Sequence, residues 1–115
     1  MTPASATAAG KTPAELRLVI LWSVRGSGSP GELERWAREQ LPVLRAAPGV
    51  HEVCLRRVAP VSLRWDVDWS GAFELRVSGE SVRELCDRGA CGDLLADMRL
   101  LGMRPAAMLL DGEPA

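Results

Sequence analysis

Stretches of apolar residues, separated by turn-forming residues, predict four β-strands along this chain. Residues 16–24 are apolar and β-branched with polar residues only at the ends, a pattern typical of a strand covered on both faces. Residues 50–58 alternate in part, and residues 72–77 alternate strictly, between apolar and polar side chains. Residues 103–110 supply a last, mostly apolar strand.

The segment after the first strand predicts a helix. Pro30 suits the first helical position, Ser29 suits the N-cap before it, and Glu32 completes a capping box. Pro42 is expected to kink this helix or to start a fresh turn, and Pro48-Gly49 is expected to end it. One apolar stripe at helical spacing is formed by Leu33, Trp36, Ala37, Leu41 and Leu44.

A second helix is predicted between the third and fourth strands. Ser81 and Glu84 form another capping box at its start. Glycine residues are expected to interrupt the helix around residues 89–92, and Gly102 is a suitable left-handed stop. The apolar residues beyond the interruption are Leu94, Leu95, Met98 and Leu101.

The resulting order, β-α-β-β-α-β, predicts an α+β domain of ferredoxin-like type, with a four-stranded antiparallel sheet and two helices on one face. Because the first strand is apolar on both sides, the second face of the sheet needs a cover, and a second copy of the chain is the simplest one. We predict one domain over residues 15–111, a disordered tail over residues 1–14 and a short tail over residues 112–115.

Composition excludes several classes of function. A net charge of −1 over 115 residues gives no basic surface for nucleic acid or for an anionic membrane. No stretch approaches the roughly 18 apolar residues of a membrane span. The N-terminus shows no secretory signal pattern, so we expect a cytoplasmic protein.

The cysteine and histidine content predicts no metal site. The chain has three cysteines, without CxxC spacing, and one histidine, which does not favour zinc. We interpret Cys54, Cys86 and Cys91 as reduced thiols, the last two as packing residues of the second helix. No cofactor is expected.

Three segments carry a resemblance to a known family. Residues 36–50 are predicted to take a helix through Leu-Pro-Val-Leu into Pro-Gly-Val, and residues 68–75 read Asp-Trp-Ser-Gly-Ala-Phe-Glu-Leu. Residues 81–97 belong to the predicted second helix, with Leu-Leu-Ala-Asp in its second half. In these segments the chain resembles the dimeric α+β barrel superfamily, and within it the small EthD-like and antibiotic-biosynthesis-type proteins. The resemblance implies a homodimer whose two sheets face each other. It also implies that ligands bind between each sheet and its own helices or loops, or within the barrel.

Candidate catalytic residues lie on the second and third strands. His51 is the only residue whose ordinary pKa makes it a natural base near neutrality, and it is predicted to share a face with Val53; a structural or exposed histidine is the alternative. Glu74 and Arg76 alternate with apolar positions, so they are predicted to face away from the helices, where Arg56 joins them. They predict either an ion-pair network or a site in which an arginine binds an enolate beside a carboxylate.

Tryptophans supply candidate walls for a substrate pocket. Trp65 and Trp69, with Asp68 between them in sequence, lie in a long loop, where ligand contact and dimer contact are equally compatible with the pattern. Trp22 is a further candidate, although core packing is favoured for it. Residues 26–31 read GxGxxG between a strand and a helix, but Pro30 removes a backbone donor and the tandem units of a dinucleotide-binding sheet are missing.

These patterns, with the resemblance, predict a small-molecule enzyme of bacterial secondary, polyketide-like metabolism. Its reaction is expected to be cofactor-independent cyclisation or isomerisation, by proton transfer, of a hydrophobic or carbonyl-rich ligand. Two alternatives stay open: a non-catalytic dimer that binds a ligand or partner, and a cofactor-free monooxygenase. The chain contains no asparagine and no tyrosine, and the resemblance assigns asparagine a part in the oxygenase branch.

Overall fold

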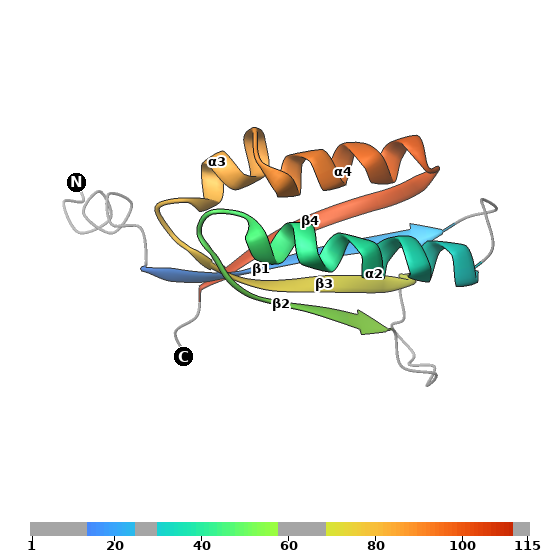
Figure 1. The fold of residues 1–115 in the computed structure, drawn as a ribbon, viewed down its shortest axis with the longest axis horizontal. Coiled ribbons are helices and arrows are strands. Elements are labelled where there is room, and N and C mark those ends of the chain that lie inside the picture. Colours follow the sequence, from blue (N-terminus) through green and yellow to red (C-terminus); the bar gives the residue numbers. More distant parts are fainter. Residues whose placement is uncertain (1–13, 25–29, 58–68, 112–115) are drawn as a thin grey trace, which may run out of the picture.

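A computed structural model of the chain describes residues 14–24, 30–57 and 69–111. Along the sequence the elements are β1 (Glu15–Val24), α2 (Pro30–Ala46), β2 (Val50–Arg57), β3 (Gly71–Ser78), α3 (Val82–Asp87), α4 (Ala90–Leu100) and β4 (Met103–Asp111) (Figure 1). The predicted tails fall almost wholly on residues outside this description. None of the described helices is long and apolar enough to cross a membrane.

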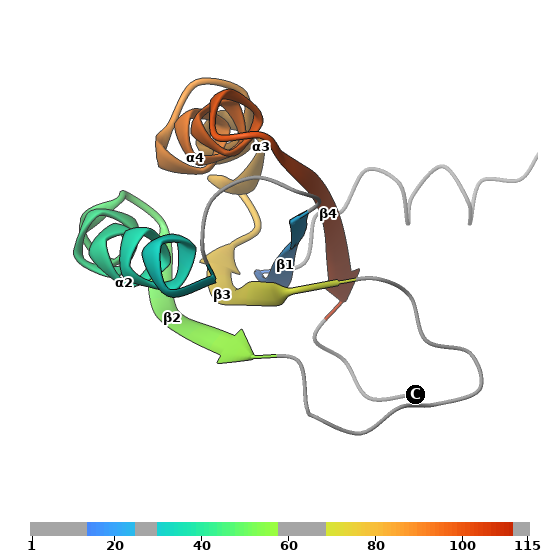
Figure 2. The same cartoon turned by 90° about the vertical axis from the view of Figure 1, so that its right-hand side faces the viewer.

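The four strands form one antiparallel sheet in the order β2-β3-β1-β4. Strand β1 lies between β3 and β4, so the chain follows the predicted ferredoxin-like β-α-β-β-α-β plan. All three described helices lie on the same side of the sheet (Figure 2). The predicted fold class is therefore confirmed.

Alternate residues of the strands point under the helices and form the core. On β3, Phe73, Leu75 and Val77 are fully buried, and on β1 the even-numbered residues from Leu16 to Trp22 are buried as well. The strict alternation of β3 and the helical stripe of α2 meet here, because each contributes one apolar face to the same layer. The remaining side chains of these strands point to the other side of the sheet.

We call that other side the open face, since no described helix covers it. By strand register its residues are Arg17, Val19, Leu21, Glu52, Cys54, Arg56, Ala72, Glu74, Arg76, Ala106, Met108 and Leu110. The prediction that β1 is apolar on both faces is confirmed at Val19 and Leu21, which are half-buried beside other strands. Met108 and Leu110 are exposed.

Helix α2 is continuous from Pro30 to Ala46 and contains Pro42. No fresh turn starts at Pro42. The residue is exposed, so water can reach the carbonyl group that the missing N–H leaves without an intrahelical partner. Gly49 has a φ of 83°, which allows the turn into β2.

The second helical segment differs from its prediction in two details. Ser81 has a φ of −100° and a ψ of −13° and makes no side-chain cap hydrogen bond, so the predicted capping box with Glu84 is wrong. An N-cap side chain reaches the helix N–H groups from an extended backbone, and Ser81 is not extended. The interruption falls at Arg88 and Gly89, and α4 already begins at Ala90. Gly102, with a φ of 82°, follows α4 as predicted.

Candidate functional site

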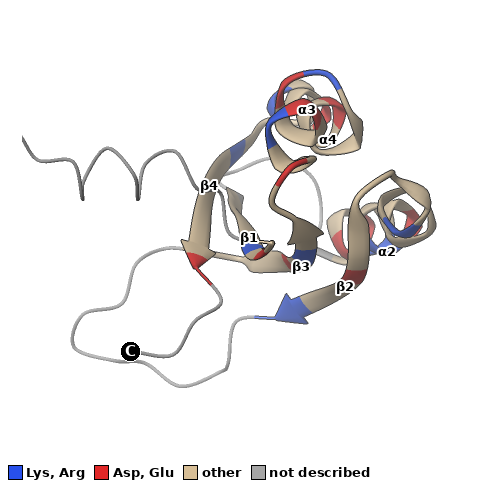
Figure 3. Cartoon of the chain, turned by 90° about the vertical axis from the view of Figure 1, so that its left-hand side faces the viewer, with Lys and Arg blue, Asp and Glu red and all other residues tan. Residues whose placement is uncertain are grey.

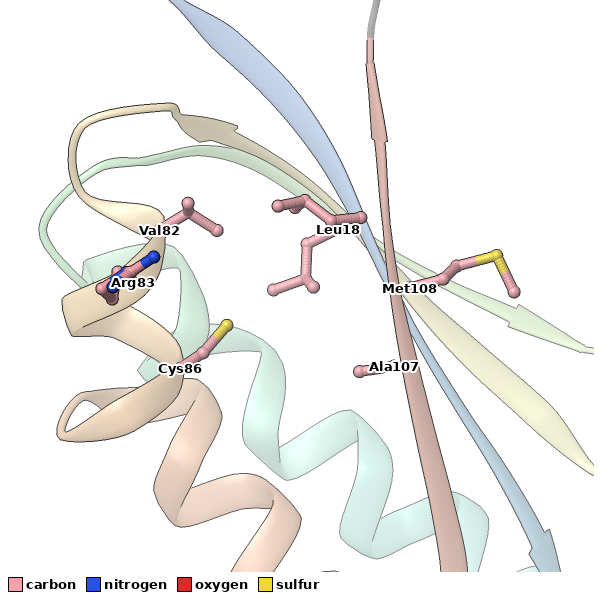
Figure 4. A pocket seen from close by; sticks show the side chains of 7 residues that line it. Leu18, Val82, Arg83, Cys86, Ala107 and Met108 are labelled. Atoms are coloured by element: carbon pink, nitrogen blue, oxygen red, sulfur yellow. The ribbon is translucent and has the colours of Figure 1, made fainter. Parts of the chain in front are cut away.

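A cavity of about 300 Å³ lies between α3 and the edge strand β4. Figure 4 shows it bounded by α3 on one side and by β1 and β4 on the other. Its lining residues are Leu18, Val82, Arg83, Cys86, Ala107, Leu109 and Met108, the last with its side chain pointing across β4 to the open face (Figure 4). The wall is therefore apolar, with one thiol and one cationic side chain.

The cavity arises because the helix layer draws away from the end of β4. Helix α4 packs on β4 near its start, where Met103 is buried. Further along, Leu109 pairs with Leu18 in the sheet, yet Leu109 is 47 % exposed whereas Leu18 is 3 % exposed. The break between α3 and α4 sets this geometry, since it tips α3 out of line with α4 (Figure 1).

The glycines around the break allow its close packing. A Cβ at Gly89 would lie 2.9 Å from the Leu85 Cα, and one at Gly92 would lie 2.6 Å from the Cys86 carbonyl oxygen. Because backbone atoms cannot give way as a flexible side chain does, both positions require glycine. The glycines that the sequence marks as an interruption thus help to place Cys86 on the cavity wall.

Cys86 points its sulfur towards the cavity (Figure 4). Burial raises the pKa of its thiol, and the neighbouring Asp87 carboxylate raises it further. Burial also raises the pKa of Cys91 to about 12, with a smaller contribution from Cys86. Both groups stay protonated at neutral pH and are poor nucleophiles, which agrees with the interpretation of these residues as packing cysteines.

A second group of polar residues lies on the open face. Glu74 Oε2 is 3.2 Å from Arg17 Nη1, and Glu74 Oε1 is 3.4 Å from Arg56 Nε. Arg76 Nε is 2.9 Å from Glu15 Oε1. The predicted ion-pair network of Glu74 with Arg56 is confirmed, and it also includes Arg17, which the sequence pattern did not indicate. Figure 3 shows charged positions on β1, β2 and β3, whereas most of β4 is uncharged.

His51 lies apart from the cavity, on the edge strand β2. The register of β2 against β3 shifts between Val50 and Glu52, so His51 occupies an irregularity and is exposed, whereas Val53 is buried. The shared face predicted for His51 and Val53 is therefore wrong, because the extra residue resets the alternation. Strands β2 and β4 are the two edges of the sheet, about 14 Å apart at ~4.8 Å per strand spacing, so His51 is remote from the cavity.

The tryptophans occupy different environments. Trp22 is 5 % exposed, and its ring centroid lies 5.1 Å from that of Phe73, which is the core position that the sequence favoured. Trp69 is half-buried immediately before β3. Trp65 and Asp68 lie outside the described residues, as does most of the glycine-rich stretch before α2. Within the described ranges, no group of three His, Cys, Asp or Glu side chains is placed to hold a metal ion.

The candidate site found by geometry thus differs from the one predicted from sequence. Arg83 and the three β4 residues that line the cavity were not singled out. A signal was present, since β4 is apolar at nearly every position from Ala106 to Leu110, beyond what one buried face requires.

No family model matches the chain, and no curated protein does. Solved structures do match. A variant of SnoaB, a cofactor-independent oxygenase from Streptomyces nogalater, is 17 % identical with a TM-score of 0.65, over 89 % of this chain and 96 % of that one. A dimeric ferredoxin-like protein of unknown function from Thermobifida fusca is 18 % identical with a TM-score of 0.62, over 85 % and 91 %.

An EthD family protein from Bacillus halodurans is 16 % identical to this chain with a TM-score of 0.61, over 88 % of this chain and 99 % of that one. The chain therefore shares the ferredoxin-like fold of dimeric α+β barrel proteins, as the resemblance predicted. At these identities the likeness establishes the fold and leaves the activity open.

Proposed function

We propose that this protein is a homodimeric small-molecule enzyme that works without a cofactor. Its reaction is the cyclisation or isomerisation, by proton transfer, of a small, mainly apolar and carbonyl-rich molecule of secondary, polyketide-like metabolism. The observation that carries the proposal is the apolar cavity between α3 and β4. Its volume of about 300 Å³ stands at the lower end of the ~300–1,000 Å³ typical of ligand pockets, which favours a small ligand.

The cavity offers groups for binding and for charge stabilisation. Apolar walls exclude water, and Arg83 can stabilise the negative charge that develops on a carbonyl oxygen. SnoaB, which shares this fold, is a cofactor-independent oxygenase, so oxygenation without a cofactor is a further candidate. The absence of asparagine from this chain counts against it.

The predicted catalytic residues lie outside the α3–β4 cavity. His51, Glu74 and Arg76 stay the predicted catalytic residues, and Trp69 a predicted substrate-binding residue, for a substrate held against the open face. A substrate in the α3–β4 cavity would meet none of them in its own chain, because none lines that cavity. The described lining residues hold no group that takes up a proton readily at neutral pH. This observation favours a second candidate function, a non-catalytic dimer that binds a ligand.

The dimer follows from the open face. Val19 and Leu21 are half-buried there, and Met108 and Leu110 are exposed, in a band along β1 and β4. A second copy would cover this band with an equal one. The Thermobifida fusca protein with the same fold is described as dimeric, which supports this assembly. We propose a cytoplasmic location, in which the three free cysteines stay reduced.

Native mass spectrometry of the gently purified full-length protein tests the proposal. We expect twice the chain mass, together with a small bound molecule whose mass identifies the ligand class. Incubation of that molecule with the protein then separates the two candidate functions: a change in its mass or chromatographic retention supports the enzyme, and quantitative recovery supports the binder. A monomer without bound ligand at micromolar concentration contradicts both.

In the catalytic case, His51→Ala tests the predicted base. Because His51 is exposed and outside the core, we expect the variant to fold and turnover to be abolished. Retained turnover excludes His51 as the base.

A further inference from the structure

The α3–β4 cavity has a distinctly two-part wall. Six of its seven lining residues, all except Arg83, are uncharged and mostly apolar. Such a wall takes up hydrocarbon by excluding water, and apart from Arg83 its side chains offer a buried polar group only the weak S–H donor of Cys86. A ligand that fits it therefore has an apolar body, and Arg83 is the lining side chain that binds a polar group of that ligand most strongly.

Arg83 differs from the arginines of the open face in its pairing. Arg17, Arg56 and Arg76 each lie within 4.0 Å of a carboxylate. Among the described residues Arg83 has no such partner, although Asp87 stands one helical turn further along α3. An arginine without an ion pair keeps its planar fork of N–H donors available, and the group that this fork matches best is a carboxylate.

From these two observations we infer that the cavity selects a small apolar carboxylate, whose body lies against Leu18, Val82 and Leu109 and whose acid group is held by Arg83. This inference rests on the proposed function, in which the same cavity binds the ligand, and it narrows the ligand to one chemical class. It applies whether the protein converts that ligand or only binds it.

Octanoate and octanamide form a suitable pair of probes, because they share the same alkyl chain and differ in charge. Isothermal titration of the full-length protein at about 0.15 M salt gives both dissociation constants. Cys86 reports the location of binding, since its sulfur faces the cavity. Its rate of alkylation by an apolar maleimide, followed by peptide mass spectrometry, should fall when either probe is bound, while the rate at Cys54 on the open face should not change.

Arg83→Gln is the decisive variant and Arg88→Gln its matched control. Both arginines are exposed and lie on or next to α3, but Arg88 does not line the cavity. We expect octanoate to bind the natural protein about tenfold more tightly than octanamide, which is the effect of one partly exposed charge-assisted contact. Arg83→Gln should abolish this difference without changing octanamide binding, Arg83→Lys should keep part of it, and Arg88→Gln should keep all of it.

The outcomes separate the inference from the proposed function. If both probes protect Cys86 with equal affinity, or if Arg83→Gln leaves octanoate binding unchanged, the selection of a carboxylate is wrong and the cavity remains a ligand site. If Arg88→Gln weakens the binding of octanoate as much as Arg83→Gln does, the effect comes from the net charge of the protein, and the inference is wrong. If neither probe binds or protects Cys86, the cavity takes up no small apolar ligand, and the proposed function loses the observation that carries it.

Discussion

On β3, Phe73, Leu75 and Val77 point under the helices and are no more than 1 % exposed, whereas Glu74 and Arg76 point to the open face and hold ion pairs with neighbouring strands. Over β1 and β3 the covered face is thus closed within one chain. The open face is divided into an apolar band on β1 and β4 and a charged region that extends over β2 and β3 to Arg17 of β1. The charged groups of the open face form ion pairs with one another, whereas its apolar groups remain partly exposed to water.

This difference shows which surface of the folded chain still needs a cover. An ion pair at a surface remains well solvated and needs no cover. A band containing Leu21, Met108 and Leu110 is stabilised only when another apolar surface removes it from water. We therefore expect substitutions on the covered face to act on folding, and substitutions in the apolar band to act on association.

The largest expected effect separates two leucines on opposite faces. Leu75 is fully buried on the covered face, and Leu21 is half-buried on the open face. Leu75→Ala should lower the free energy of unfolding by about 2–5 kcal/mol at every protein concentration, because it leaves a cavity in the core. Leu21→Ala should lower the free energy of unfolding by less than this in dilute protein. The loss should increase with protein concentration as the dimer forms. Urea unfolding at two concentrations measures both, and equal, concentration-independent costs would contradict the comparison.

A charge placed in the apolar band should prevent association. Leu21→Lys introduces an ammonium group that a dimer would bury without a partner, so we expect the dissociation constant of the dimer to rise at least about a hundredfold. Leu100→Lys is the matched control, since Leu100 is 85 % exposed at the end of α4, away from the open face. Light scattering after gel filtration should show a monomer for the first variant only. A dimer that survives Leu21→Lys would place the interface elsewhere.

The two faces also explain how far the sequence could predict this structure. Strand β3 and its covered face follow from alternation alone, because each apolar position of β3 has the same environment along the whole strand. Strands β1 and β4 follow from their apolar runs instead. The irregularity at His51 has no such signal, since a single extra residue in β2 is set by its pairing with β3. The capping box at Ser81 failed for a similar reason: residue types fit the motif, but the backbone enters α3 without the extended turn.

The candidate site was less predictable than the fold. Glu74 and Arg56 were expected together because they lie on adjacent strands with the same parity, and register then brings them into contact. Arg83 gave no comparable signal, because an arginine on a short polar helix is ordinary. It becomes a candidate only through the gap between α3 and β4, which depends on how two helices meet at a break.

Alkaline pH should destabilise the covered side through Cys91. Its folded-state pKa, about 12, lies above the ordinary value of 9.0. The folded state therefore favours the neutral thiol, and the resulting stability is complete below pH 9 and is lost as the pH rises towards 12. Over that window we expect the free energy of unfolding of the natural protein to fall by up to about 1.4 kcal/mol per pH unit more steeply than that of Cys91→Ala. Parallel slopes in urea titrations would show that the thiol remains accessible to water.

The smallest effect compares two carboxylates that each contact two arginines. Glu74 contacts Arg17 and Arg56 on the open face, and Glu34 contacts Arg38 and Arg57 on the helix side. In a monomer, Glu74→Gln and Glu34→Gln should each cost less than about 1 kcal/mol and lose that effect in high salt, because such partly exposed pairs are screened. In the dimer only Glu74 becomes buried, so removing its charge leaves two guanidinium groups without a counter-charge away from water. Urea unfolding at low and high protein concentration should therefore show a larger cost for Glu74→Gln only where the dimer is present, and equal costs for the two variants there would mean that the charged region stays in water outside the interface.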